Sequence, residues 1–151
     1  MSERVFKAEP GSFAIETTYV FDAPRARVFE AYNDPELTAQ WWGPEGSDLT
    51  VEKLEVEKGG SWRFVLGLDQ PFPFSGVFHQ VTAPEQLVFT WQYEDAPVVL
   101  LQTVTFEETA DGGTKVTDQG VFRSVEDRDS MVKMGMGEGS LPQFDRLAKL
   151  L

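Results

Sequence analysis

The 151-residue chain combines 41% hydrophobic residues with a formal net charge of -12 and no cysteine. The lack of cysteine excludes disulfides, thiolate nucleophiles and cysteine-ligated zinc, and the acidic charge disfavours nucleic acid and anionic membranes as partners. Residues 1–10 contain no apolar run, so the sequence indicates neither a signal peptide nor a membrane span, and we expect one domain over residues 1–151 in the cytoplasm.

The first expected elements are a strand over residues 13–21, rich in β-branched and aromatic types, and two short helices. Asp22 followed by Pro24 predicts the start of the first helix, and Asp34-Pro35 predicts the start of the second. The second helix carries Trp41 and Trp42 side by side before Gly43-Pro44 ends it. Neighbouring helix residues lie about 100° apart, so we expect one of these indoles to face a groove or cavity.

Between residues 48 and 121 the hydrophobic period changes to two, which predicts an antiparallel meander. With the first strand, this gives about seven strands: 13–21, 49–56, 62–66, 74–81, 87–93, 98–106 and 114–121. Residues two apart on a strand share a face. We therefore expect Trp62, Phe64, Phe89 and Trp91 to lie together on the concave face of the sheet.

A final helix is predicted to begin at Ser124, which has capping-box spacing to Asp127. Three glycines at 135, 137 and 139 and a proline at 142 then interrupt the helical pattern. Because Pro142 lacks the N–H that a continuous helix needs, we expect the helix to bend or restart between Gly135 and Pro142.

Strand, two short helices, further antiparallel strands and a long C-terminal helix follow the order of the helix-grip fold. This is an α+β arrangement in which a curved antiparallel sheet wraps around the last helix. Several stretches carry a family resemblance, in this order: residues 21–24, Trp41-Trp42-Gly43-Pro44, residues 59–64, 76–78, 85–91 and 112–114, Gly135-Met136 and residues 145–147.

In these stretches the chain resembles the SRPBCC (START-like) superfamily, within its activator-of-heat-shock-protein-90-ATPase-like and polyketide-cyclase-like branch. The resemblance implies a cavity between the concave sheet and the final helix, able to hold a small apolar or amphipathic ligand. Many members carry Trp where Ser140 aligns and a helix-compatible residue where Pro142 stands. The geometry of the last helix, and the shape of the cavity beneath it, are therefore left open.

The predicted cavity wall is aromatic, with methionines from the final helix as additional candidates. Methionines at helical spacing equally fit a role as core filler. The expected ligand-binding residues are Trp42, Trp62, Phe64, Phe78, Phe89, Trp91, Met131 and Met134.

Residues suited to catalysis are few. His79 is the only histidine, and its alternation with Phe78 places it on the solvent side if Phe78 faces the core. One histidine without cysteine cannot form a standard zinc or non-haem iron site, so we expect neither a metal nor a cofactor. Glu138, between two glycines, is the specific acid–base candidate. Arg63 and Asp118 lie in regions expected to approach the cavity, or else on solvated faces.

The expected function is binding of a small hydrophobic or amphipathic molecule. Two alternatives stay open: a cyclase or dehydratase type of enzyme that uses the same cavity, and a protein-interaction module that acts on a chaperone. Phe72, between Pro71 and Pro73, fits either a gate to the cavity or a contact in a homodimer.

Overall fold

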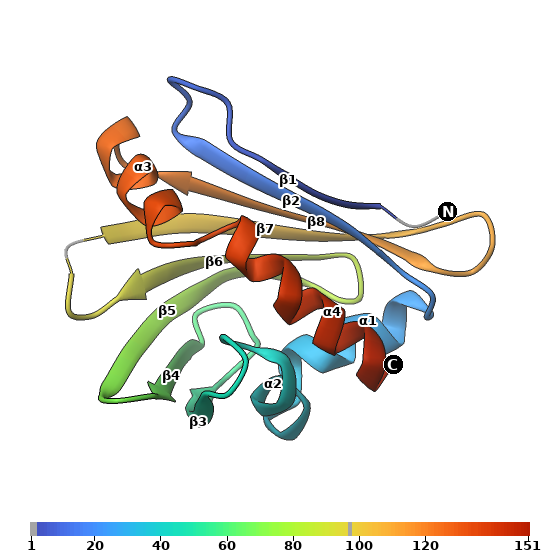
Figure 1. Ribbon diagram of the computed structural model, residues 1–151. Helices are drawn as coiled ribbons and strands as arrows, with labels where there is room; N and C mark the ends of the chain where they lie inside the picture. Colours follow the sequence, from blue (N-terminus) through green and yellow to red (C-terminus); the bar gives the residue numbers. More distant parts are fainter. Residues whose placement is uncertain (1–2, 97) are drawn as a thin grey trace.

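The computed structural model describes residues 3–96 and 98–151, apart from the side chain of Glu138. Across these residues the chain forms one eight-stranded antiparallel sheet with helices on one side (Figure 1). In chain order the elements are β1 (Arg4–Lys7), β2 (Ala14–Phe21), α1 (Arg25–Asn33), α2 (Pro35–Trp41), β3 (Asp48–Leu54), β4 (Ser61–Gly67), β5 (Pro71–Thr82), β6 (Gln86–Tyr93), β7 (Val98–Glu108), β8 (Thr114–Phe122), α3 (Val125–Lys133), the 3₁₀ helix η1 (Glu138–Ser140) and α4 (Leu141–Leu150).

The strand order is β1-β2-β8-β7-β6-β5-β4-β3, which confirms the predicted α+β helix-grip arrangement with one difference in strand number. The prediction of about seven strands missed β1. This edge strand has only four residues, and it is defined by pairing with β2 from Arg4 opposite Tyr19 to Lys7 opposite Glu16. Four residues are too few for a period-two pattern to be recognised.

The C-terminal helix restarts as predicted. α3 ends at Lys133, and Gly135 and Gly137 adopt positive φ angles of 100° and 93° before η1 and α4 begin. Only glycine takes this backbone conformation without strain. α4 then runs across the strands of the sheet, with α1 and α2 beside its C-terminal end (Figure 1).

Two neighbouring side chains hold α4 in place. Asp145 accepts hydrogen bonds from Arg4 (2.8 Å to Nη2) and from the Tyr19 hydroxyl (2.6 Å), which ties the helix to β1 and β2. Arg146 donates from Nη2 to the carbonyls of Trp41 and Gly43, which ties it to the end of α2. The helix is therefore fixed from both sides.

Two groups of buried residues fill the concave side of the sheet. The first, which we call the helix-side core, packs under α1, α2 and α4 and includes Phe21, Val28, Phe106, Phe144 and Leu147. The second, which we call the aromatic core, lies under the α3–η1 segment and includes Trp62, Phe64, Phe78, Trp91 and Met131.

A bulge in β5 changes which residues of that strand face inward. The pairing with β6 shifts between Phe78 and Gln80, so Phe78 and Val81 both pack inward while His79 and Gln80 are both exposed. The solvent-facing position predicted for His79 is therefore confirmed. Bulges also increase local strand twist, which contributes to the curvature of the sheet.

Gly76 lets two strands approach closely, and its replacement provides a test of this packing. A Cβ at this position would lie 1.8 Å from the Thr90 carbonyl oxygen and 2.5 Å from Nε1 of Trp62. We predict that Gly76→Ala lowers the free energy of unfolding by about 2 to 3 kcal/mol, the cost of overpacking.

Gly67→Ala is the matched control, since its Cβ would meet only ordinary contacts at 3.5 Å and beyond. We expect it to change the unfolding free energy by less than about 0.5 kcal/mol in urea denaturation. Equal midpoints for the two variants would contradict the close approach at Gly76.

Candidate functional site

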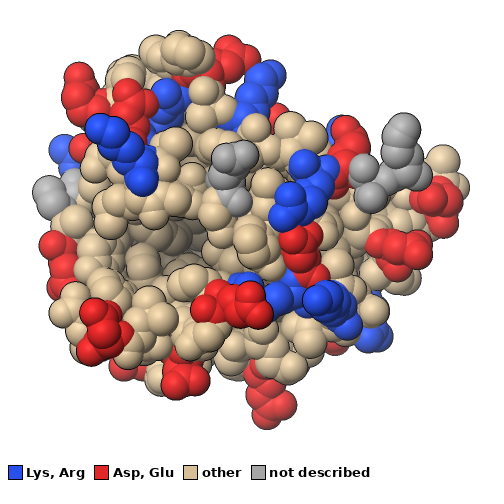
Figure 2. Space-filling view, viewed as in Figure 1, with Lys and Arg blue, Asp and Glu red and all other residues tan. Residues whose placement is uncertain are grey.

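A cavity of about 510 Å³ opens between the concave face of the sheet and the segment from α3 to α4. Figure 2 shows it as a hollow whose visible wall consists of uncharged residues. Strands β4, β5 and β6 supply most of the aromatic side chains, and the end of α2, the α3–η1 segment and α4 close the other sides. The cavity lies where the resemblance predicts one.

All eight predicted ligand-binding residues lie on the wall of this cavity: Trp42, Trp62, Phe64, Phe78, Phe89, Trp91, Met131 and Met134. Several of the aromatic rings in this set contact one another. The ring centroids are 5.1 Å apart for Trp42 and Phe64 and 6.3 Å apart for Trp62 and Phe89. Met134 differs from the others because it is 72% exposed, which suits a position at the mouth. Their role in binding stays a prediction.

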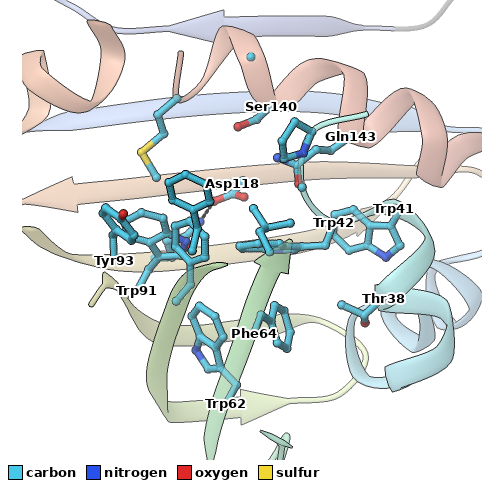
Figure 3. Close-up of a pocket in the computed structure, with 18 of the residues that line it drawn as sticks. Thr38, Trp41, Trp42, Trp62, Phe64, Trp91, Tyr93, Asp118, Ser140 and Gln143 are labelled. Carbon is cyan, nitrogen blue, oxygen red and sulfur yellow. Dashed lines mark hydrogen bonds between the residues drawn. The ribbon is translucent and has the colours of Figure 1, made fainter. Parts of the chain in front are cut away.

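The two adjacent tryptophans make different contacts: Trp41 is buried in the helix-side core, whereas Trp42 is partly buried and packs against both cores. The Trp41 ring packs on Tyr32 and Phe144, and its Nε1 donates to the Ala31 carbonyl at 3.0 Å. Trp42, the residue that caps α2, packs edge-on against Phe64 (Figure 3). The expectation that one of these indoles faces a cavity is confirmed, and both of them line it.

The structure places the other candidates differently, and His79 and Arg63 are not part of the cavity wall. His79 is exposed on the outer face, and Arg63 alternates with inward residues and donates to Glu94 and Glu52 at the sheet surface. The side chain of Glu138 lies outside the described residues, so its acid–base role stays a prediction. Phe72 lines the cavity and contacts the Tyr93 ring, with centroids 6.2 Å apart.

The wall has one distinctly polar end, formed by side chains from β8, β7 and α1. Asp118 points into the cavity (Figure 3), and its Oδ1 accepts a hydrogen bond of 2.9 Å from Gln102 Nε2. Tyr32 also lines the cavity, and its hydroxyl oxygen is the buried side-chain polar atom without a hydrogen-bond partner in the part of the chain that the structure describes. These three residues supply the polar chemistry at this end.

The environment of Asp118 changes its acidity. Burial raises the pKa of its carboxyl from 3.8 to about 6, and the hydrogen bond from Gln102 only partly opposes this effect. The residue is part-buried and borders the cavity. Burial and the nearby Asp118 charge together raise the pKa of Tyr32 well above its usual range. Asp118 therefore titrates near neutral pH, whereas Tyr32 stays protonated.

The alternation of inward and outward residues along β7 and β8 indicates this polar end. Asp118 shares the inward phase of β8 with Val116 and Phe122, and Gln102 shares the inward phase of β7 with Leu100 and Val104. A polar residue in an otherwise apolar phase indicates either a buried network or a site. Sequence reasoning reached Asp118 only as a residue near the cavity and missed Gln102 and Tyr32.

Within residues 3–96 and 98–151, no group of three or more His, Asp or Glu side chains is arranged to hold a metal ion. None of the helices described there is long and apolar enough to cross a membrane.

The raised pKa of Asp118 gives a pH-dependent stability prediction. Because the folded-state pKa lies above the unfolded value, the folded chain binds the extra proton between about pH 4 and 6, and the free energy of unfolding falls as pH rises through this window. Asp118→Asn removes this dependence. Relative to the wild type, the variant should gain at most about 3 kcal/mol between pH 4 and 8, less where cavity water hydrates the carboxylate.

Urea denaturation at several pH values measures this gain, with Glu57→Gln as the control. Glu57 lies exposed in the turn between β3 and β4, so its replacement removes one charge without changing the cavity. A stability difference between Asp118→Asn and wild type that stays constant with pH would contradict the burial of this carboxyl.

Comparisons with known proteins agree with the fold. Protein Ms6760 from Mycobacterium smegmatis is 26% identical, with a TM-score of 0.90 over 100% of this chain and 97% of that one. A protein from Arthrobacter aurescens is 27% identical, with a TM-score of 0.85 over 95% of this chain and 88% of that one. A protein of the dynemicin biosynthetic locus, DynU16, shares the fold at 21% identity and a TM-score of 0.69, covering 91% of this chain and 46% of that one.

A search among curated protein sequences finds no match. A family model described as "Activator of Hsp90 ATPase homolog 1-like protein" matches residues 22–151, which include every described helix and all described strands except β1 and β2. The resemblance seen in the sequence is thereby confirmed, and the chain belongs to the Activator of Hsp90 ATPase homolog 1-like family.

Proposed function

We propose that this protein binds a small, mostly apolar molecule in the cavity between the sheet and α4. The observation that carries the proposal is the cavity itself, a 510 Å³ space whose wall includes all four tryptophans of the chain. Cavities of this size with a mainly apolar wall and a few convergent polar groups are the usual form of small-molecule sites.

The mouth supports the same proposal. Leu68 and Met134 both line the cavity, and they are 53% and 72% exposed. Large apolar side chains left in water around a hollow favour an apolar occupant, which covers them on binding. Leu68 belongs to the turn between β4 and β5, and Met134 follows α3, so the mouth is bordered by two separate segments.

The aromatic wall gives a mutational test with the neutral dye Nile red. Trp42→Ala and Trp62→Ala should weaken dye binding by about 1 to 3 kcal/mol each, since each removes a ring from the wall. His79→Ala is the control, because His79 lies exposed on the other face. Circular dichroism checks that each variant is folded, and equal dye affinity in all three folded variants would remove the aromatic residues from the site.

A second candidate function is favoured by Asp118. A carboxyl that titrates near pH 6 inside an apolar cavity can take a proton from a bound substrate, which is the requirement of a cyclase or dehydratase type of enzyme. Gln102 keeps its hydrogen bond to Oδ1 and leaves Oδ2 as the oxygen available for proton transfer. The carboxylate form is the base, so turnover should increase as pH rises through the pKa.

The base can be tested without knowledge of the substrate, by elimination of 5-nitrobenzisoxazole. The carboxylate removes the ring C–H proton while the N–O bond breaks to release a cyanophenolate. We expect wild type to catalyse this reaction with a midpoint near pH 6 and Asp118→Asn to lose on the order of 100-fold in rate. The Glu57→Gln control should keep it, and equal rates in wild type and Asp118→Asn would exclude Asp118 as a base.

A further inference from the structure

The polar end of the cavity presents an acid without a counterion. None of the described residues that line the cavity is Lys, Arg or His, so Asp118 is the ionisable group there apart from tyrosines. Arg146, on the adjacent α4, donates from Nη2 to the carbonyls of Trp41 and Gly43. This arginine is therefore committed to holding the helix.

We propose that the cavity binds a protonated organic amine, with its ammonium group against Asp118 and its apolar body among the aromatic rings. This inference rests on the proposed binding function and adds the chemical class of the ligand. It differs from the simple apolar occupant because it assigns a charge to one end of the molecule.

Hydrogen bonding at Asp118 supports a donor at this end. Oδ1 accepts from Gln102, whereas no described group of the chain donates to Oδ2. A ligand that displaces water from this ionised carboxylate must supply a donor or a positive charge to offset the lost hydration. The Tyr32 hydroxyl oxygen, which is also without a partner, lies close enough for the Asp118 charge to affect it. An ammonium group has three donors and suits two such oxygens.

The rings beside this end favour a cation as well. Phe89 pairs in register with Gln102 on the neighbouring strand, so the aromatic wall begins directly next to the carboxyl's partner. Its ring contacts Phe78 and Trp62, with centroids 5.4 and 6.3 Å away. A cation near the face of an aromatic ring gains about 0.5 to 2 kcal/mol, the upper value when water is excluded.

The whole-chain charge acts in the same direction. A net charge of -12 attracts cations and repels anions at long range. A fatty acid or another anionic amphiphile would also place its carboxylate in an end that already holds Asp118, or leave it in the apolar part of the cavity. A neutral alcohol can donate one hydrogen bond to Oδ2 but brings no charge, so it is the closest competitor.

Three naphthalene compounds of similar size separate these classes: 1-naphthylmethylamine, 1-naphthylmethanol and 1-naphthoate. Isothermal titration at about pH 7.5 compares their affinities for wild type, Asp118→Asn and the charge-matched control Glu57→Gln. We expect wild type and Glu57→Gln to bind the amine about tenfold more tightly than the alcohol, and the naphthoate most weakly. In Asp118→Asn the preference for the amine should be lost while the alcohol affinity changes by less than about threefold.

The outcomes separate this inference from the proposed function. An amine preference that persists in Asp118→Asn, equal binding of amine and alcohol by wild type, or tighter binding of the alcohol each overturns the amine proposal and leaves the apolar cavity function standing. If none of the three compounds binds while Nile red does, the amine proposal is likewise overturned and the apolar cavity function stands. Failure of Nile red together with all three overturns the binding function itself.

Discussion

The cavity depends on a mismatch between the curved sheet and the helix that covers it. α4 has ten residues and spans about 15 Å, whereas the eight strands of the sheet, spaced about 4.8 Å apart, span about 34 Å. The helix can therefore cover only part of the concave face. The helix-side core fills that part, and the aromatic core under the α3–η1 segment is left with an open space.

The break between α3 and α4 maintains this mismatch. Gly135 and Gly137 turn the chain with positive φ angles, and a Cβ on Gly137 would lie 2.0 Å from the Phe6 ring. Gly135 and Gly139 line the cavity, and a Cβ built on either would meet nothing within 4 Å, so these glycines leave open space beside the cavity. Asp145 and Arg146 hold the restarted helix against β1, β2 and the end of α2, so α4 cannot slide over the open part without losing these bonds. One part of the sheet therefore carries the packed helix-side core, and another part of the same sheet carries the open cavity.

Much of this arrangement could be predicted from local patterns. Period two correctly placed Trp62 with Phe64 and Phe89 with Trp91, because these strands are long and one face is strongly aromatic. The restart near Pro142 followed from backbone chemistry alone. Helix geometry indicated that one of the two adjacent tryptophans faces a cavity, and both line it. β1 was missed because a four-residue edge strand is specified by its pairing with β2 and not by its own sequence.

The polar end was harder to predict because it is built from three elements far apart in the sequence. Asp118 was noticed only as a charge near the cavity, and nothing local indicates that Gln102 donates to it or that Tyr32 from α1 lies at the same end. The acidity of Asp118 arises from burial, which exists only in the folded chain. In the sequence, such a site is indicated by a polar residue at an inward, otherwise apolar position on each of two neighbouring strands.

Entry of a ligand into this cavity can be measured directly from the four indole N–H groups. Trp41, Trp42, Trp62 and Trp91 all line the wall. In ¹H–¹⁵N spectra, titration with Nile red is predicted to move the indole signals of Trp42, Trp62 and Trp91 while the backbone amide of His79 on the outer face stays in place. Movement of outer-face amides with unchanged indole signals would contradict a binding site between the sheet and α4.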